Sequence, residues 1–274
     1  MASLATHQSA ATTKLLFIGN SGAGKTGALA SLASAGYKLR IIDLDNGLDV
    51  LANLLGDATS TYDKGAIERV KFVTLTEKMK MLNGIVMPVA ATVWSKMTNL
   101  LSDWKDGEEK LGPVTTWTSD DVLVIDSLSF LGTAAMNFIL QVNGRLGKAP
   151  FQSDWGEAQR LLESLLQMLY STDVKCNVIV CCHIVFLGKE GEQEKGFPNA
   201  LGKALPPKIG RYFNSTLMAE TKGQGSAARR VIVTNTSSMV ELKNTAPLKV
   251  KPEYPLTTGL ADYFFALHGK HPTK

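Results

Sequence analysis

Short, continuous apolar runs recur along the chain and alternate with segments whose apolar residues repeat every three to four positions. A continuous run is typical of a strand buried on both faces, whereas the repeat is typical of an amphipathic helix. The runs predict strands at residues 14–19, 39–44, 70–75, 121–126 and 177–186. The repeats predict helices at 25–36, 88–105, 128–142 and 155–170.

Two more strand-like runs, 215–220 and 229–236, flank the turn sequence KGQGSA and predict an antiparallel hairpin that extends the sheet. The order of the elements predicts a three-layer α/β fold, with a mostly parallel core and antiparallel carboxyl-terminal strands. Residues 1–13 are small and polar, so we expect a flexible arm there and a single domain over 14–274. The polar segment 106–120 is expected to be a connector or a surface loop, 142–154 an exposed loop and 187–207 a mobile loop.

The composition, 45% hydrophobic and 20% charged over 274 residues, is that of a packed globular protein and excludes global disorder. No apolar run reaches eighteen residues, and the amino terminus lacks the basic-then-apolar order of a signal peptide. We therefore expect a cytoplasmic protein without a membrane partner. Cys176, Cys181 and Cys182 lie in or beside one apolar run, which favours buried, reduced thiols over a zinc site.

The net charge of +4 is too small to indicate a nucleic-acid partner by itself. The basic residues are concentrated near the end of the chain, where residues 222–274 hold eight Lys and Arg against three acidic residues. This excess could contact phosphates or a neighbouring subunit, or it could serve only solubility.

A phosphate-binding motif joins the first predicted strand to the first predicted helix. The stretch KLLFIGNSGAGKT, residues 14–26, matches G-x-x-x-x-G-K-[ST]. Glycines let backbone N–H groups wrap around a phosphate, and the helix directs its positive end at the same place. Lys25 would contact the β and γ phosphates of ATP, and the Thr26 hydroxyl would coordinate Mg²⁺. The candidate nucleotide-binding residues are Gly19, Asn20, Ser21, Gly22, Ala23, Gly24, Lys25, Thr26 and Gly27.

Aspartates end two of the predicted strands. Asp126 follows four apolar residues and suits a second carboxylate on the magnesium side, although it could instead cap the helix that starts near Leu128. The strand at 39–44 delivers Asp43, Asp45 and Asp49 at or just beyond its carboxyl end. In an open parallel sheet this edge is where ligands bind.

Four motifs together resemble the RecA-like recombinases. IIDLDNGLD resembles their second-strand segment and VIVCCHIV their fourth core strand, and with GNSGAGKT and DVLVIDS these motifs follow the family's order across residues 14–186. The resemblance is greatest to phage-encoded, minimal RecA-like ATPases of single-strand annealing and recombination. It implies that Asp45 activates the attacking water and that His183 senses the γ-phosphate. The family more often has glutamate and glutamine at these positions, and His183 could instead be a core histidine.

The resemblance also implies partners. RecA-like proteins form rings or filaments in which a basic residue reaches the neighbour's active site, and the candidates here are Arg229, Arg230 and Lys243. The loops at 142–153 and 187–207 correspond to the segments that contact single-stranded DNA in the family. Aromatic rings and cations suit unpaired strands, although lysines and glutamates are equally numerous in the second loop. The candidate DNA contacts are Arg145, Lys148, Phe151, Lys195, Phe197 and Lys203.

The sequence thus predicts a magnesium-dependent ATPase that couples its nucleotide state to homo-oligomerisation and to single-stranded DNA, in phage recombination or replication. A single-strand-binding or replication protein is a further expected partner. Three alternatives stay open: a P-loop kinase of a small metabolite, an ATP-bound assembly or helicase-loader protein with little turnover, and a packaging or helicase motor. The first predicts an arginine-rich lid, the second predicts nucleotide binding without hydrolysis, and the third predicts an additional domain.

Overall fold

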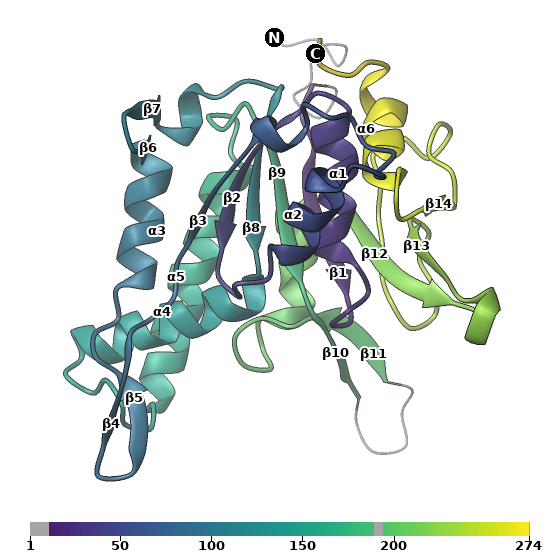
Figure 1. Cartoon of the computed structure of the whole chain (residues 1–274). Coiled ribbons are helices and arrows are strands. Elements are labelled where there is room, and N and C mark those ends of the chain that lie inside the picture. Colours follow the sequence, from purple (N-terminus) through teal and green to yellow (C-terminus); the bar gives the residue numbers. More distant parts are fainter. Residues whose placement is uncertain (1–10, 189–193, 274) are drawn as a thin grey trace, which may run out of the picture.

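The computed structural model describes residues 11–188 and 194–273. An eight-stranded sheet crosses the molecule in the order β14-β13-β12-β1-β9-β8-β2-β3 (Figure 1). The strands from β12 to β3 in this order are parallel to one another. Strand β13 pairs with β12 in the antiparallel direction, and β14 pairs with β13 in the same way. The predicted α/β class, with a mostly parallel core and antiparallel carboxyl-terminal strands, is confirmed. The bounds are β1 Lys14–Gly19, β2 Lys38–Asp43, β3 Val70–Thr74, β8 Asp121–Asp126, β9 Asn177–Cys182, β12 Ser215–Lys222, β13 Arg229–Val233 and β14 Glu253–Pro255.

Helices cover both faces of the sheet, α1, α2 and α6 on one and α3, α4 and α5 on the other (Figure 1). Strand β1 shows why its run is continuously apolar: Leu15 and Phe17 pack into the first layer, and Leu16 and Ile18 into the second. Side chains of successive strand residues point to opposite faces, so a strand between two helical layers needs apolar residues at every position. The helices are α1 Lys25–Ser34, α2 Asp49–Gly56, α3 Val93–Ser102, α4 Leu128–Val142, α5 Gln152–Tyr170 and α6 Gly259–His268.

The helix predicted over 88–105 is shorter in the structure. The Glu77 carboxylate accepts hydrogen bonds from the backbone N–H groups of Thr92 and Val93 and so stabilises the start of α3. Pro88 belongs instead to the hairpin of β4 Met79–Leu82 and β5 Ile85–Pro88. A second hairpin, β6 Trp104–Asp106 with β7 Glu109–Gly112, replaces the first part of the expected loop at 106–120.

The strand predicted over 177–186 is divided at His183, where the chain leaves the sheet. Beyond this residue, β10 Ile184–Leu187 pairs with β11 Lys195–Pro198 in a separate hairpin. The segment 187–207 is predicted to be a mobile loop, but its described part contains β11 and the buried Leu201 and Leu205. Residues 189–193 of this segment lie outside the described residues.

Thr12 and Thr13, at the end of the expected arm, pack against the fold. Residues 1–10 of the expected arm lie outside the described residues. Thr12 and Thr13 are buried, and the backbone N–H of Thr13 donates to Asn177 Oδ1 at 2.8 Å. The Asn214 amide donates to the Thr12 carbonyl at 3.2 Å, so both threonines belong to the folded core.

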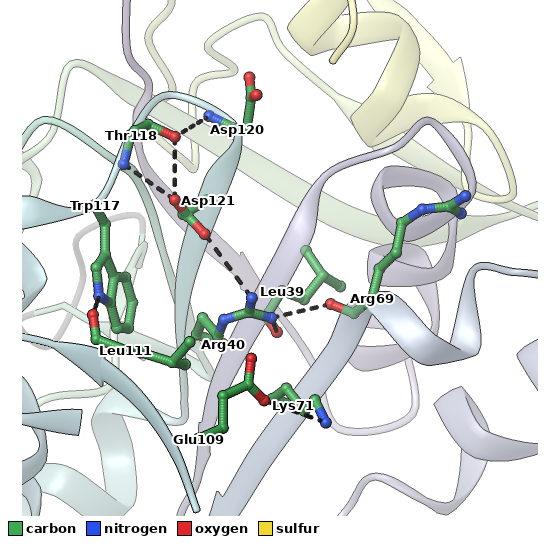
Figure 2. A network of polar contacts seen from close by, with 10 residues as sticks. All are labelled: Leu39, Arg40, Arg69, Lys71, Glu109, Leu111, Trp117, Thr118, Asp120 and Asp121. Atoms are coloured by element: carbon green, nitrogen blue, oxygen red, sulfur yellow. Dashed lines mark hydrogen bonds and ion pairs between the residues drawn. The ribbon is translucent and has the colours of Figure 1, made fainter. Parts of the chain in front are cut away.

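A paired polar network occupies the amino ends of β2 and β8 (Figure 2). The buried Arg40 guanidinium donates to the carbonyls of Leu39 and Arg69 and lies 4.0 Å from Asp121. The Asp121 carboxylate also accepts hydrogen bonds from the backbone N–H and the hydroxyl of Thr118. At this end of the sheet, the opposite charges of Arg40 and Asp121 therefore lie close together, and each side chain has hydrogen-bond partners.

The cysteines agree with the expectation of buried, reduced thiols. All three cysteines are buried free thiols, and burial raises the pKa of Cys176 to about 11. Within the described residues, no helix is long and apolar enough to span a bilayer.

Candidate nucleotide-binding site

The phosphate-binding motif forms a loop between β1 and α1. Gly24 has a φ of 95°, and a Cβ there would lie 2.4 Å from Leu256 Cδ2. A Cβ at Gly19 would lie 2.5 Å from the Ala219 carbonyl oxygen. Both positions therefore require glycine, one for its backbone conformation and both for the close approach of neighbouring elements. The amino end of α1 opens at Lys25, directly after the loop.

Lys25 and Thr26 are held in defined positions at the start of α1. The Lys25 ammonium is buried and donates to the carbonyls of Gly19 at 2.9 Å and Asn20 at 3.0 Å. The Thr26 hydroxyl donates to Asp126 Oδ2 at 2.7 Å. The helix start and the end of β8 are thus joined through one hydroxyl–carboxylate contact.

Three aspartates gather at the carboxyl ends of β2 and β8. Asp43 and Asp126 are neighbours in the register of these strands, and Asp45 follows two residues after β2. Asp43 is buried and accepts hydrogen bonds from Thr74 Oγ1 at 3.0 Å and from the Gly47 N–H at 3.3 Å. Like charges at such short range favour protonation of one member of the group.

The pKa values of this group follow from that arrangement. Burial, with the charges of Asp126 and Asp43, raises the pKa of Asp45 to about 6. Burial is also the main reason that the pKa of Asp126 lies above its usual range, although Thr26 and Lys25 act in the opposite direction. One buried oxygen of Asp45, Oδ1, has no hydrogen-bond partner among the described residues.

His183 lies at the junction between β9 and the β10–β11 hairpin. Its side chain is half-buried, and desolvation, with the nearby Lys25 charge, lowers the pKa of the imidazole. The backbone carbonyl of His183 accepts a hydrogen bond from the Asn199 N–H at 2.7 Å, just beyond β11. The residue is therefore connected both to the nucleotide site and to the hairpin.

One cavity of about 300 Å³ brings most of the predicted residues together. Asp45, Asp126 and His183 line it together with the loop, while the predicted residues Gly19, Asn20 and Ala23 do not border it. Arg230, on β13, also lines it, so a residue expected to reach a neighbouring subunit faces the loop of its own chain. The lining residues are Ser21, Gly22, Gly24, Lys25, Thr26, Gly27, Asp45, Val50, Asp126, His183 and Arg230.

The other two basic candidates for action on a neighbouring subunit lie away from this cavity. Arg229 forms an ion pair with Glu253, and Lys243 is an exposed residue whose backbone pairs with Thr216.

The candidate DNA contacts occupy two separate places. Arg145 forms an ion pair with the buried Asp154, and its guanidinium lies 4.2 Å from the centre of the Phe151 ring. Arg145 thus stabilises its own loop, while Phe151 and Lys148 are exposed. On the other side, Lys195 and Phe197 belong to β11, and Lys203 is exposed in the segment that follows.

The residues present fit a nucleotide with magnesium better than a metal held by protein alone. Among the described residues, no group of three or more His, Cys, Asp and Glu side chains could hold a metal ion. Magnesium usually keeps several waters and takes one or two protein oxygens together with substrate phosphates. Thr26 and Asp126 supply such oxygens, and the amide-lined loop supplies the anion site.

Sequence reasoning missed three features of the site. Asp43 was placed at the sheet edge without a role, although it is a member of the carboxylate group. Val50, on α2, and Leu256, packed against Gly24, come from segments without any recognisable motif. In the sequence, only the short separation of Asp43 and Asp45 in IIDLD could have indicated that Asp43 belongs to the site.

The fold and the site define a P-loop nucleotide-binding protein of the α/β class. A model of the AAA domain family matches residues 11–246, so the chain belongs to this family of P-loop ATPases. No curated protein matches the chain.

Similar solved structures include a KaiC-like protein from the archaeon Pyrococcus horikoshii, at 12% identity, 89% coverage of this chain, 85% of that chain and a TM-score of 0.41. The flagellar accessory protein FlaH from Methanocaldococcus jannaschii has the same identity and TM-score, with 91% and 88% coverage.

Proposed function

We propose that the chain is a magnesium-dependent ATPase that hydrolyses ATP in the cavity between the phosphate-binding loop and the strand-end aspartates. The observation that carries the proposal is the convergence of Lys25, Thr26, Asp45 and Asp126 on this one cavity. A loop that only binds nucleotide does not need a second carboxylate in the same cavity, whereas hydrolysis needs a group that orients water.

Each residue has a role that follows from its present contacts. The Lys25 ammonium, held by two carbonyls, is available to phosphate oxygens because charge-assisted bonds are stronger than bonds to neutral carbonyls. Thr26 and Asp126 would hold magnesium, which when bound offsets the negative charge of the phosphates. Asp45, which lines the cavity, would accept a hydrogen bond from the attacking water and orient it toward the γ-phosphate. Arg230 would add a cation from the same chain.

The proposed activity is coupled to partners through His183. A change of its hydrogen bonding on loss of the γ-phosphate would move the start of β10 and therefore the β10–β11 hairpin. We infer that the hairpin and the exposed Phe151 and Lys148 contact single-stranded DNA, that the protein works as a homo-oligomer, and that its biological role is phage recombination or replication. A single-strand-binding or replication protein would be a further partner.

The test measures ATP hydrolysis with and without single-stranded DNA, for the parent chain and for Lys25→Ala. We expect Lys25→Ala to lower turnover by about a hundredfold or more, since it removes a charge aimed at the transferred phosphoryl group. Single-stranded DNA should raise parental turnover, and its binding should weaken with salt. Unchanged turnover in Lys25→Ala would refute the site, and salt-insensitive or absent DNA binding would refute the DNA partner.

One observation favours a second candidate, an ATP-bound assembly or loader protein with little turnover. The pKa of Asp45, raised to about 6, leaves a larger share of this carboxyl protonated near neutral pH, and a protonated carboxyl cannot accept the proton of the attacking water. This candidate predicts tight ATP binding with hydrolysis near the uncatalysed rate. Single-turnover hydrolysis measured beside equilibrium binding separates it from the ATPase.

A further inference from the structure

Arg230 is a cation on β13 that faces the phosphate-binding loop. It borders the nucleotide cavity, and its Cδ lies 3.6 Å from the place where a Cβ on Gly24 would stand. The next residue along the strand, Arg229, points to the other face of β13 and forms an ion pair with Glu253. Among the described residues, the Arg230 side chain has neither an ion-pair nor a hydrogen-bond partner. Of these two adjacent arginines, Arg230 is therefore the one whose donors are available to a phosphate.

Leu256, directly after β14, contacts both the loop and the strand that carries Arg230. Its buried side chain packs against Gly24. Its backbone N–H donates to the Arg230 carbonyl at 3.1 Å and so continues the antiparallel pairing of β13 with β14. Because both contacts come from one residue, Leu256 fixes the distance between the phosphate-binding loop and β13.

Helix α6 anchors Leu256 to the rest of the nucleotide site. It lies beside α1 (Figure 1), and its Ala261 N–H donates to Ser31 Oγ at 3.3 Å. Buried aromatic side chains of α6 belong to the same apolar layer as α1. Since α1 begins directly after the loop, the segment 253–268 is attached both to the loop and to the helix that continues it. This segment lies beyond residues 11–246, the part of the chain that the family model matches.

We propose that this carboxyl-terminal segment, residues 253–268, completes the hydrolytic site within a single chain. Leu256 is a positioning residue, which holds Gly24 and aims Arg230 at the phosphates that the loop binds. The inference rests on the proposed hydrolysis of ATP. It assigns to Arg230 of the same chain the task for which the sequence predicted a basic residue from a neighbouring subunit.

The reaction gives the Arg230 charge a defined target. The oxygen of the attacking water bonds to the γ-phosphorus while the bond from this phosphorus to the β–γ bridging oxygen breaks. ADP leaves with the electron pair of that bond, the proton of the water passes to Asp45, and inorganic phosphate is the second product. Negative charge grows on the bridging oxygen during this step. A guanidinium donates parallel hydrogen bonds to phosphate oxygens, so Arg230 stabilises the transition state more than bound ATP.

The experiment measures kcat and KM for ATP in the full chain. Arg230→Ala removes the contact, Arg230→Lys keeps a cation without the planar donors, and Arg229→Ala is the matched control on the paired arginine. We expect Arg230→Ala to lower kcat by about a hundredfold, with Arg230→Lys between it and the parent and Arg229→Ala like the parent. Both arginines are exposed, so thermal unfolding should be unchanged. Equal kcat in Arg230→Ala and Arg229→Ala overturns the proposal.

The positioning role of Leu256 is tested with a conservative and a truncating variant. Leu256→Met keeps an apolar side chain of similar volume, whereas Leu256→Ala withdraws the contact with Gly24. We expect Leu256→Ala to lower kcat by about tenfold with a smaller change in KM, and Leu256→Met to restore kcat to near the parent value. Both are assayed well below their melting temperatures. A lower melting temperature with an unchanged kcat would make Leu256 merely structural and overturn its positioning role.

Mixed assemblies separate action within one chain from action on a neighbour. Lys25→Ala and Arg230→Ala are co-expressed with different tags and purified through both tags. If Arg230 acted on a neighbour, such an assembly would contain sites with both residues intact, and turnover would return. We expect no return, and a return overturns the proposal. Variants that do not co-purify are monomers, and parental turnover by a monomer supports the proposal directly.

Failure of the proposed ATPase is visible separately, as a parent without turnover or as equal turnover in Lys25→Ala. The comparison then uses the affinity for ATP, measured by equilibrium titration. Weaker binding in Arg230→Ala than in Arg229→Ala supports the contact between Arg230 and the phosphates of its own chain. Equal affinity of these two variants overturns it.

Discussion

At the amino ends of β2 and β8, Arg40 and Asp121 have opposite charges, and both have hydrogen-bond partners (Figure 2). At the carboxyl ends of the same two strands, Asp43 and Asp126 are neighbours of the same charge, and Asp45 joins them. The same pair of strands therefore ends in a neutralised network on one side and in a cluster of excess negative charge on the other.

This difference separates a stabilising arrangement from a functional one. Opposite charges with partners lower the free energy of the folded state without any ligand, whereas adjacent carboxylates raise it until a cation arrives. Substitutions at the two ends should consequently have opposite effects on stability and activity. Those at the amino end should change stability without changing activity, and those at the carboxyl end should change activity at little or no cost in stability.

Asp126→Asn is expected to have the largest effect. Turnover should fall by about a hundredfold or more, because the variant loses the charge that would hold magnesium. The melting temperature should stay the same or rise, since asparagine can still accept the Thr26 hydrogen bond and repulsion from Asp43 and Asp45 is relieved. Steady-state hydrolysis and thermal unfolding check both parts, and a marked fall in melting temperature would contradict the comparison.

Arg40→Met should act in the opposite way. It removes the donor to the Leu39 and Arg69 carbonyls and the partner of Asp121, so the free energy of unfolding should fall by about 3 kcal/mol. Urea denaturation measures this loss, and equilibrium titration should find ATP affinity unchanged. A variant as stable as the parent would show that the amino-end network contributes little.

The pH dependence of the unliganded protein should report the carboxylate cluster. The Asp45 pKa is raised from 3.8 to about 6, so the folded state binds this proton more tightly than the unfolded state does. Stability is therefore lost as the pH rises from about 4 to about 6. Asp45→Asn should flatten this part of a stability–pH curve measured by urea denaturation. Turnover of the parent should rise over the same range as Asp45 ionises, and an unchanged curve in the variant would assign the proton elsewhere.

Lys71→Ala is expected to have the smallest effect. Lys71 lies 3.6 Å from Glu109 in the amino-end region, and both side chains are about half exposed. Exposed ion pairs contribute little, so the free energy of unfolding should change by less than about 0.5 kcal/mol. Added salt should make this small difference smaller still, because it screens exposed charges. A loss comparable to that of Arg40→Met would mean that the whole network, and not the buried guanidinium, stabilises this end.

Much of the fold was predictable because its strands are buried on both faces. The runs at β1, β8 and β9 are apolar between their end residues, the run at β2 is interrupted only by Arg40, and the predicted hairpin of β12 and β13 is confirmed. The two small hairpins were not predictable in the same way. MKMLNGIVMP contains a turn signal, but its strands bury neither face, so it lacks the alternation that marks a half-buried strand.

The division of the run at His183 illustrates a related difficulty. Residues 177–187 are almost uninterruptedly apolar, and hydrophobicity alone does not tell where a chain leaves one sheet for another. In the structure the exit follows from tertiary pairing, because β10 bonds to β11 and β9 to β1 and β8.

For the site, the sequence by itself determined the chemistry that follows each strand: the glycine loop with Lys25 and Thr26, and the aspartates after two apolar runs. These are local features, set by residue type and by distance from the end of a strand. Only the tertiary structure decided which of them share a cavity. Arg230 faces the loop of its own chain because β13 folds back antiparallel to β12, and Asp43 meets Asp126 because β2 and β8 are adjacent and in register. Such contacts depend on the order of strands in the sheet, and no local pattern in the chain specifies that order.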